Sequence, residues 1–568
     1  MQQKQPRDVG DAREGTVCTA TPAPRRRAHV AAVVATGLAL AAGAAASPFD
    51  PSRTQSFDQS NFILFGEGVE AGDGFGRSLA AGDFDCDGFD DLAVGVPFED
   101  AQIVLPPDPP IERLDSGVVH VIYGSEDGLV ATDNQYFRES DVQGGATENR
   151  DRFGEVLASG DFDGDLCDDL AIGVPFEHLG TVGDAGVVYV LYGGPGGLDG
   201  GDAQLWHQET AFVIGLAEPD DEFGTSLATG DLNGDGRDEL IIGAPAEALD
   251  DGGFEGAVWV LRGSVVRLQA VTEPWVQLIT QDDPRVADAG EVGDAFGSSL
   301  ATCDVDGDGF DELYVSSPGE SGLFPSSGAL HVFFGSSGGH TLEDPDDVLL
   351  LGTSSDLFSG DSMAAAFDDP VTGCTVALGQ PRHDVPTSAG AVIDGGSLRL
   401  TKRLANGTDW GASGFRQDGL AAHYEAGGFD PVEQADRFAS VLAYGDFTGN
   451  GLGDLAIGTW EEDLGAVDEG LVQILFARTG TPLGSEARSV RQVDVLPGTV
   501  VGESKGFGFA LATGDFDGDG KDELAVGAPF EEVDGEALAG TVTVMYSAFV
   551  FTDGFESGDL SAWSTTTP

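Results

Sequence analysis

The sequence has few basic residues, few cysteines and no long apolar run beyond its first 46 residues. Its 27 Lys and Arg face 98 Asp and Glu, and the formal net charge of −71 argues against nucleic acid as a partner, because a polyanion would be repelled. Without a second apolar run of bilayer length, we expect no transmembrane span in the mature chain. The histidines form no pair at zinc-ligand spacing, and no Gly-x-Ser-x-Gly elbow or phosphate-binding loop is present, so the sequence predicts no enzyme.

Glycine and acidic residues are abundant. The 568 residues include 85 Gly at a hydrophobic content of 41%, which is typical of a turn-rich globular chain rather than a disordered one. Many of the acids stand in repeated loops, where bound divalent cations would offset their mutual repulsion. We therefore expect a fold that depends on calcium.

The repeated acidic stretch is represented by residues 82–97, GDFDCDGFDDLAVGVP. Counted from Asp83 as loop position 1, acids stand at positions 1, 3, 5 and 9, and position 7 offers a backbone carbonyl. Oxygens of this kind and number suit Ca²⁺, which takes about 6 to 8 of them. Gly88 at position 6 permits the sharp turn that brings them together.

An EF-hand begins in the same way, but it requires a carboxylate at position 12 and a helix after the loop. Position 12 is Val94, inside a short apolar run that is typical of a buried strand. The stretch is therefore predicted to be a calcium loop in a β-hairpin. The alternative is an ordinary Asp-Gly turn with solvated acids, and the recurrence of acids at positions 1, 5 and 9 in five copies favours metal ligation.

Seven copies of one unit follow from residue 73. Each opens on Phe-Gly or a near match, and in six copies the first loop acid lies eight residues after the phenylalanine; the seven are Phe75, Phe153, Phe223, Phe296, Phe358, Phe438 and Phe507. A third strand follows each hairpin, as at 118–123 and 187–192, and a more variable fourth strand comes after it. Four strands in each of seven units predict an all-β fold, a seven-bladed β-propeller of four-stranded antiparallel blades. We expect Phe62–Phe65 to add the outermost strand of the last blade and close the ring.

Six of the seven loops keep acids that can bind metal, whereas the fifth has Ala366 at position 1 and Pro370 where a ligand is needed. In the second loop Leu166 replaces the glycine, which predicts strain, and the sixth loop keeps two carboxylates, which predicts weaker binding. The predicted metal ligands at positions 1, 3, 5, 7 (by its carbonyl) and 9 are Asp83, Asp85, Asp87, Phe89 and Asp91; Asp161, Asp163, Asp165, Cys167 and Asp169; Asp231, Asn233, Asp235, Arg237 and Glu239; Asp304, Asp306, Asp308, Phe310 and Glu312; Asp446, Thr448, Asn450, Leu452 and Asp454; and Asp515, Asp517, Asp519, Lys521 and Glu523.

The segments outside the repeats have distinct compositions. Residues 1–46 combine three arginines, an Ala/Val/Leu run and a small-residue cleavage site, which predicts a signal peptide; a retained membrane anchor is the alternative. Residues 47–72 form an N-terminal segment, 73–548 the propeller with repeats starting near 73, 151, 221, 294, 356, 436 and 505, and 549–568 a tail.

Four cysteines remain after the predicted leader, an even number for an exported chain. Cys86 and Cys167 fall in the loops of blades 1 and 2, and Cys303 and Cys374 at the loops of blades 4 and 5. We therefore hypothesise two disulfides between neighbouring blades, 86 to 167 and 303 to 374. The alternative is four buried free thiols.

The scattered His120 and His331 fall on predicted third strands and are interpreted as packing residues.

The combination of Phe-Gly, an Asp-rich loop and Gly-Ala-Pro, as at 243–245 and 527–529, resembles the FG-GAP repeat. That repeat is found in the N-terminal propeller of integrin α chains and in many bacterial surface and secreted proteins. The resemblance implies adhesion or ligand binding outside the cell, with structural calcium. The tail, with DGFESGD followed by Ala-Trp, resembles a segment of exported bacterial proteins and implies a sorting or processing tag.

The leading functional hypothesis is a secreted or cell-surface calcium-binding propeller with an extracellular protein or glycan ligand. The alternatives are a carbohydrate-binding propeller and a hydrolase with its site in the propeller channel. Variable connections are the predicted ligand-binding segments, namely residues 105–110, 193–202 and 401–435, the last with four aromatic residues.

Overall fold

The computed structural model describes residues 49–65, 68–103, 111–249, 253–270, 277–283, 286, 289–321, 327–337, 348–351, 360–369, 373–383, 385–387, 390–392, 396–403, 410–415, 437–462, 469–481, 483–496 and 505–547. The predicted signal peptide, the tail, Phe358, residues 105–110 and most of 401–435 lie outside these ranges. Among the described residues, no helix is long and apolar enough to cross a membrane.

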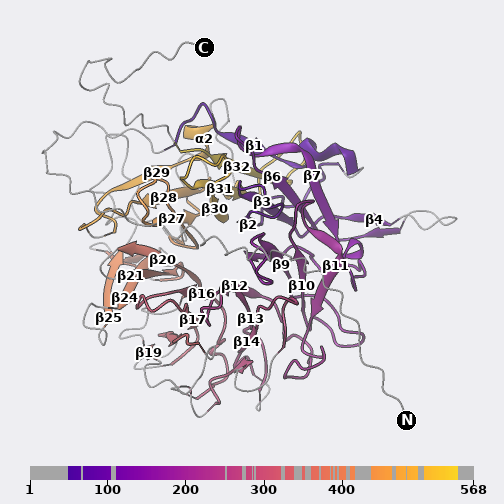
Figure 1. Ribbon diagram of the computed structural model, residues 1–568. Helices are drawn as coiled ribbons and strands as arrows, with labels where there is room; N and C mark the ends of the chain where they lie inside the picture. The colour runs from indigo at the N-terminus through magenta and orange to yellow at the C-terminus, as the bar shows by residue number, and fades with distance from the viewer. Residues whose placement is uncertain are drawn as a thin grey trace, which may run out of the picture. The chain divides into compact units, whose positions relative to one another are not determined.

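The chain folds into a seven-bladed β-propeller of four-stranded antiparallel sheets, as predicted (Figure 1). The first three blades consist of β2 (Ser78–Gly82), β3 (Asp91–Val96), β6 (Val118–Tyr123) and β7 (Val130–Arg138); β8 (Val156–Gly160), β9 (Asp169–Val174), β10 (Val187–Tyr192) and β11 (Asp199–Trp206); and β12 (Ser226–Gly230), β13 (Glu239–Ala244), β14 (Ala257–Leu261) and β15 (Leu278–Ile279). The last four consist of β16 (Leu300–Cys303), β17 (Glu312–Ser317), β18 (Ala329–Phe333) and β19 (Val348–Leu351); β20 (Ser362–Asp369), β21 (Gly373–Gln380), β24 (Ser397–Arg403) and β25 (Trp410–Phe415); β26 (Val441–Gly445), β27 (Asp454–Thr459), β28 (Leu471–Leu475) and β29 (Ala487–Val490); and β30 (Ala510–Gly514), β31 (Glu523–Ala528), β32 (Thr541–Met545) and β1 (Gln55–Phe57).

Short elements occupy some of the connections. Two hairpins join the second and third strands of blades 1 and 5; they are formed by β4 (Ala101–Ile103) with β5 (Ile111–Arg113) and by β22 (Val385–Thr387) with β23 (Gly390–Val392). In the described part of the chain, three short helical segments follow outer strands: η1 (Gln59–Phe65), which has a kink at Phe62, η2 (Glu139–Asp141) and α2 (Gln492–Val495). Of the predicted ligand segments, 193–202 ends inside β11 and 401–435 includes the end of β24 and all of β25.

An N-terminal strand closes the last blade, but the predicted residues were wrong. The closing strand is β1, which pairs antiparallel with β32 and sets Gln55 opposite Val544. The more apolar run at Phe62–Phe65 instead lies in the helical turn η1. There the ring of Phe62 is buried and stacks on Phe75, with 5.9 Å between centroids, so Phe62 packs into the interface between blades 7 and 1 instead of extending a sheet.

The hydrophobic core is divided into seven clusters, one at each interface between neighbouring blades. Successive residues of a strand face opposite neighbours, so in β3 Leu92 and Val94 pack against blade 7 while Ala93 packs against blade 2. Because both faces of each blade are covered, all six residues of β3 are buried. This explains why the second strands are continuous apolar runs rather than alternating ones.

The recurrent Phe-Gly and Gly-Ala-Pro glycines meet across these interfaces. The carbonyl of Gly154 in blade 2 lies against Gly95 of blade 1 and accepts a 2.6 Å hydrogen bond from the Ser78 hydroxyl. A Cβ atom at Gly95 would overlap that carbonyl and Ser78, and Gly154 has a φ of 90°, which side chains disfavour. Both glycines are therefore required by the close approach of neighbouring blades.

Where the acidic loop is lost, the hairpin is longer. In blade 5, β20 and β21 each have 8 residues, whereas β2 has 5 and β3 has 6. The strands continue through the region that forms an acidic loop in the other blades, in agreement with the absence of ligand residues from the fifth copy.

Replacing Gly95 by Ala should destabilise the protein by about 3 kcal/mol, because the added methyl group must displace the Gly154 carbonyl and the neighbouring blade with it. Urea unfolding measures the change. The matched control is Gly196→Ala on an exposed turn, where nothing lies within 4 Å of the added Cβ, and where we expect a change within about 0.5 kcal/mol. Equal effects of the two substitutions would contradict the close-approach argument.

Candidate functional site

The acid at position 1 holds each acidic loop in its curled form. In loop 1 the two carboxylate oxygens of Asp83 accept hydrogen bonds from the backbone N–H groups of Asp87 and Gly88, at 2.9 and 3.0 Å. Asp446 in loop 6 accepts from Asn450 and Gly451 in the same way, at 2.9 and 2.6 Å. Hence even the loop with fewest carboxylates keeps the shape of the others.

The acid at position 9 is buried at the start of the second strand. Asp91 accepts one hydrogen bond from the N–H of Phe84 in its own loop, at 2.9 Å, and one from the N–H of Gly124 at the end of the third strand, at 2.8 Å. One carboxylate oxygen each of Asp83, Asp85 and Asp91 lies within 4.8 Å of the others. Positions 1, 3 and 9 thus converge, whereas Asp87 at position 5, also predicted to converge, is not part of this group.

Two other loops bring carboxylates together at the same separation. In loop 2 the group is Asp161, Asp163 and Asp169, again positions 1, 3 and 9. In loop 4 it is positions 1, 3 and 5, namely Asp304, Asp306 and Asp308. The position 5 acids of loops 1 and 2, Asp87 and Asp165, each accept a 3.0 Å hydrogen bond from the backbone N–H at position 7.

Burial and mutual repulsion make these carboxylates hard to ionise without a cation. Burial raises the pKa of Asp91 to about 8 and that of Asp169 to about 9, and nearby loop acids raise both further. Burial likewise raises the pKa of Glu239 and Glu312 to about 9. An oxygen of each of these two glutamates is buried without a hydrogen-bond partner. The residues therefore fit a hard divalent cation, which would satisfy such oxygens and favour their charged form.

Basic side chains contact some of the loops. Arg237, whose carbonyl was predicted as a ligand, places its guanidinium 2.6 Å from Asp235, and Arg262 lies 3.3 Å from the same carboxylate. In loop 4, Arg403 lies 2.7 Å from Asp306. In loop 7, Arg53 and Lys521 pair with Asp517 and Asp519, at 2.6 and 3.2 Å. Among the described residues, no basic side chain forms an ion pair with the acids of loop 1, whereas loops 3, 4 and 7 each have at least one such pair.

Sequence reasoning missed the role of position 8. Asp168 of blade 2 accepts a 3.0 Å hydrogen bond from the N–H of Asp83 in blade 1, and its own N–H donates to the carbonyl of Asp83, at 2.9 Å. Asp90, Asp238, Asp311 and Asp522 make the same reciprocal pair of bonds to position 1 of the preceding blade. Position 8 thus links neighbouring blades, whereas the predicted ligand at position 9 turns to its own loop. Its recurrence beside position 9 was the signal available in the sequence.

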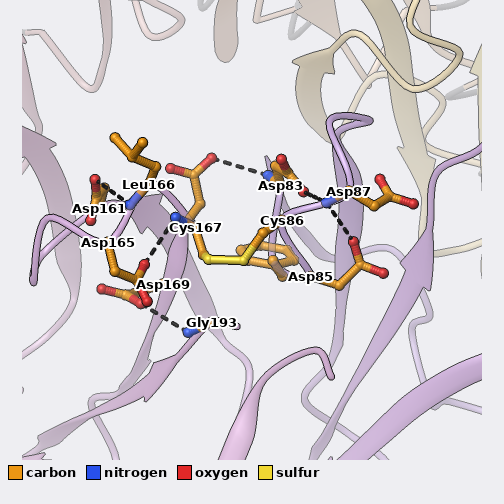
Figure 2. The surroundings of a disulfide bond; sticks show 12 residues. Asp83, Asp85, Cys86, Asp87, Asp161, Asp165, Leu166, Cys167, Asp169 and Gly193 are labelled. Atoms are coloured by element: carbon orange, nitrogen blue, oxygen red, sulfur yellow. Dashed lines mark hydrogen bonds between the residues drawn. A yellow bond between two sulfur atoms is a disulfide. The ribbon is translucent and has the colours of Figure 1, made fainter. Parts of the chain in front are cut away.

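Both predicted disulfides are present. Cys86 at position 4 of loop 1 is bonded to Cys167 at position 7 of loop 2, with 4.9 Å between Cα atoms, so two acidic loops of neighbouring blades are joined covalently (Figure 2). Cys303 and Cys374 join blades 4 and 5, with 6.4 Å between Cα atoms. The alternative of free thiols is therefore wrong.

The strain predicted for loop 2 is also present, because Leu166 has a φ of 78° at the position where loop 1 has glycine.

The two histidines on third strands are packing residues, as interpreted. His120 is buried against Phe75, with 5.7 Å between ring centroids, and His331 against Phe296, at 5.1 Å.

The sequence of these blades matches a known repeat family. The sequence matches the FG-GAP repeat at residues 75–122, 153–191, 223–261, 296–333 and 507–545. The two blades outside these matches, the fifth and the sixth, are those whose loops keep the fewest acids at the predicted ligand positions.

Three relatives illustrate the range of proteins with similar sequence. Identity is 30% over 227 residues to phosphatidylinositol-glycan-specific phospholipase D of Rattus norvegicus, 31% over 231 residues to integrin alpha-PS2 of Drosophila melanogaster, and 33% over 177 residues to integrin alpha-5 of Xenopus laevis. The matches cover 40%, 40% and 30% of this chain, but only 25%, 14% and 14% of the relatives. The names of the relatives include both an enzyme and integrins, so similarity alone does not separate the two classes.

In EGTA, the free energy of unfolding should fall as the pH rises from about 5 to about 9. Acids such as Asp91, whose folded pKa is raised by burial to about 8, contribute stability that is complete below their unfolded pKa and is lost as the pH rises through the folded one. Calcium should remove this decrease in the free energy of unfolding, since the bound ion takes the place of the protons on the buried loop carboxyl groups. Urea unfolding at a series of pH values, with EGTA or with calcium, measures the effect. Parallel profiles in the two conditions would contradict cation binding.

Leu166→Gly should raise the free energy of unfolding by about 1 kcal/mol, because glycine relieves the left-handed backbone conformation at this position. The leucine side chain is 63% exposed, so little packing is lost. Thermal unfolding measures the gain. Leu114→Gly is the matched control, since Leu114 is also exposed but has no positive φ, and it should not stabilise the protein. Destabilisation by Leu166→Gly would show that the loop is not strained.

Proposed function

From the premise that the chain is an FG-GAP repeat β-propeller protein related to integrin α chains and to a phospholipase D, we propose that it is a calcium-stabilised ligand-binding protein that acts outside the cytoplasm. Two disulfides between blades support an oxidising compartment. The five acidic loops that keep acids at positions 1, 5 and 9, together with the weaker sixth, are structural calcium sites in this proposal. The millimolar calcium common outside cells suffices for sites of modest affinity.

The observation that carries the proposal is a difference between the two ends of the blades. The acidic loops connect first and second strands, so in an antiparallel blade the connections from second to third strand, and from one blade to the next, lie at the other end. Among the described residues, more of the exposed large apolar side chains stand on those connections than at the acidic end, which has Leu166, Val265, Val266 and Phe367. They include Phe212 and Leu216, 79% and 74% exposed, between blades 2 and 3, and Phe254 and Val292 on the connections of blade 3. The segments of Phe254 and Val292 are adjacent, because Gly293 donates a 3.0 Å hydrogen bond to the Phe254 carbonyl. Exposed apolar side chains of this kind are typical of interaction sites.

The chemistry of this end favours a protein ligand. The apolar side chains named above are phenylalanine, leucine and valine, which suit the apolar core of a protein interface. The net charge of −71 attracts a partner with a basic surface and raises its association rate. We therefore place a basic extracellular protein first among the ligands, and a glycan second.

A hydrolase remains the alternative in a different class, and one pair of residues bears on it. In blade 5 the Oγ of Ser397 lies 2.7 Å from Nδ1 of His383, as in a nucleophile with its base. However, the buried Ser397 hydroxyl donates its proton to Oε1 of Gln380, at 2.8 Å, and so faces away from the imidazole. This arrangement favours a structural role for the pair.

Binding of the labelled chain to arrays of extracellular proteins and of glycans, with calcium or with EGTA, tests the proposal. We expect calcium-dependent binding to basic proteins, reduced at least tenfold by the double substitution Phe212→Ser and Leu216→Ser, a loss of about 1.4 kcal/mol. Val265→Ser is the matched control, because Val265 is 76% exposed in blade 3 but lies at the end that carries the acidic loops. Binding to glycans alone would support the second ligand class. Loss of binding in the Val265→Ser control alone would contradict the proposed site, because it would place the ligand at the end that carries the acidic loops.

A further inference from the structure

A second set of polar residues recurs at the blade interfaces, away from the acidic loops. Each set combines a residue just after the outer strand of one blade, a residue two positions before the phenylalanine of the next Phe-Gly, and a glutamate just after the second strand of that next blade. The described sets are Gln59, Asp73 and Glu99; Glu139, Asp151 and Glu177; Gln208, Asp221 and Glu247; Gln281, Asp294 and Glu320; and Gln492, Lys505 and Glu531. These side chains are almost all buried, so their charges have to be balanced locally.

In four of the five sets a glutamine amide satisfies the glutamate. The Nε2 of Gln208 donates to Oε2 of Glu247 at 2.6 Å, and Gln281 donates to Glu320 at 3.0 Å. The sets that begin with Gln59 and Gln492 make the same bond. The amide is thus the ordinary partner of the glutamate carboxylate at this place in the fold.

The set between blades 6 and 7 also contains a cation. Lys505 stands where the other sets have aspartate, and its ammonium donates to Oε1 of Glu531 at 2.9 Å and to Oε1 of Gln492 at 3.3 Å. The centre of the set therefore accommodates a positive charge that bonds to both neighbours.

The set between blades 1 and 2 has neither the amide nor the ammonium. Glu139 replaces the glutamine, so three carboxylates meet, with one oxygen of each within 4.8 Å of the others. Glu139 is fully buried; one of its oxygens accepts a 2.7 Å hydrogen bond from the Tyr189 hydroxyl, and no amide or ammonium group donates to the other, which has only the carboxyl groups of the set beside it. The Oε2 of Glu177, which an amide would satisfy in the other sets, is likewise buried without an amide or ammonium donor.

The basic residues beside these acids in the sequence do not neutralise the set. Arg138, next to Glu139, pairs with Asp141 at 3.0 Å. The guanidinium of Arg152 lies over the rings of Phe98 and Phe176, at 5.0 and 4.5 Å from their centroids. Within the part of the chain that the structure describes, no ion pair joins a basic side chain to these three acids. Burial raises the pKa of Glu139 to about 8 and that of Glu177 to about 10, so three charges cannot be held here without compensation.

We propose that Glu139, Asp151 and Glu177 bind one divalent cation, Ca²⁺ in the extracellular medium, at the interface between blades 1 and 2. The ion occupies the place that the ammonium of Lys505 occupies between blades 6 and 7. Three carboxylates and no nitrogen or sulfur donor suit a hard cation of this kind. The site is separate from the acidic loops, and it joins the two blades that Cys86 and Cys167 also join.

The test is the double substitution Glu139→Gln and Asp151→Lys, which rebuilds the arrangement between blades 6 and 7. Native mass spectrometry of the full chain across a calcium titration should show one ion fewer than in the wild type, and in EGTA the variant should unfold at a higher temperature, because the lysine replaces the ion. Asp221→Lys is the matched control: it builds the same set between blades 2 and 3 and should leave the ion count unchanged. Equal counts in wild type and double variant would overturn the proposal, and would mean that the carboxylates are protonated.

A second measurement remains available if the double variant does not fold. Terbium bound at this site should be excited through Tyr189, whose hydroxyl bonds to Glu139. Tyr189→Phe should then reduce the tyrosine-sensitised terbium emission of the full chain while the ion count stays the same. Unchanged emission would also overturn the proposal.

Discussion

The propeller depends on the distance at which neighbouring blades meet. The carbonyl of each Phe-Gly lies directly against a second-strand glycine of the preceding blade, as for Gly154 on Gly95, where no side chain fits. This contact brings the apolar faces of two blades close enough to bury Leu92 on one side of β3 and Ala93 on the other. Because the core is divided among seven such interfaces, each interface contributes separately to the stability of the ring, and a repeated motif can maintain all of them.

The acidic loops serve the same interfaces from one end. Position 1 curls its own loop and also bonds to position 8 of the next blade, so one residue is both a predicted metal ligand and a contact between blades. Binding a cation at positions 1, 3 and 9 would therefore tighten the ring as well as the loop. The loop 1 acids have no ion pair among the described residues, while Arg237, Arg403 and Arg53 partly neutralise loops 3, 4 and 7. The loops are thus chemically unequal although their shapes are alike.

The interfaces that lack the common links use others. Blade 5 has no acidic loop, and there Cys303 and Cys374 join it covalently to blade 4. On its other side Gly453 occupies position 8 of loop 6 and donates a 2.8 Å hydrogen bond to the carbonyl of Phe367, in place of a carboxylate contact. At the end away from the loops, buried polar sets link the blades. A glutamine amide donates a hydrogen bond to the glutamate in four of the five described sets, and Lys505 adds a positive charge in one of them. Variation between copies is therefore compensated at the same interface.

The sequence by itself determined the number of blades, the strands within them and the acids of the loops, because each of these follows from local spacing that repeats at a constant offset. It also placed the cysteines in facing loops, since a propeller sets equivalent loops side by side. Only the tertiary structure decided which of two adjacent acids, Asp90 or Asp91, turns to its own loop and which to the next blade. It alone also decided that Gln55–Phe57 rather than the more apolar Phe62–Phe65 closes the ring, and that Glu139, Asp151 and Glu177 meet. These outcomes depend on how two blades pack against each other, and the residue pattern of a single repeat does not determine that packing.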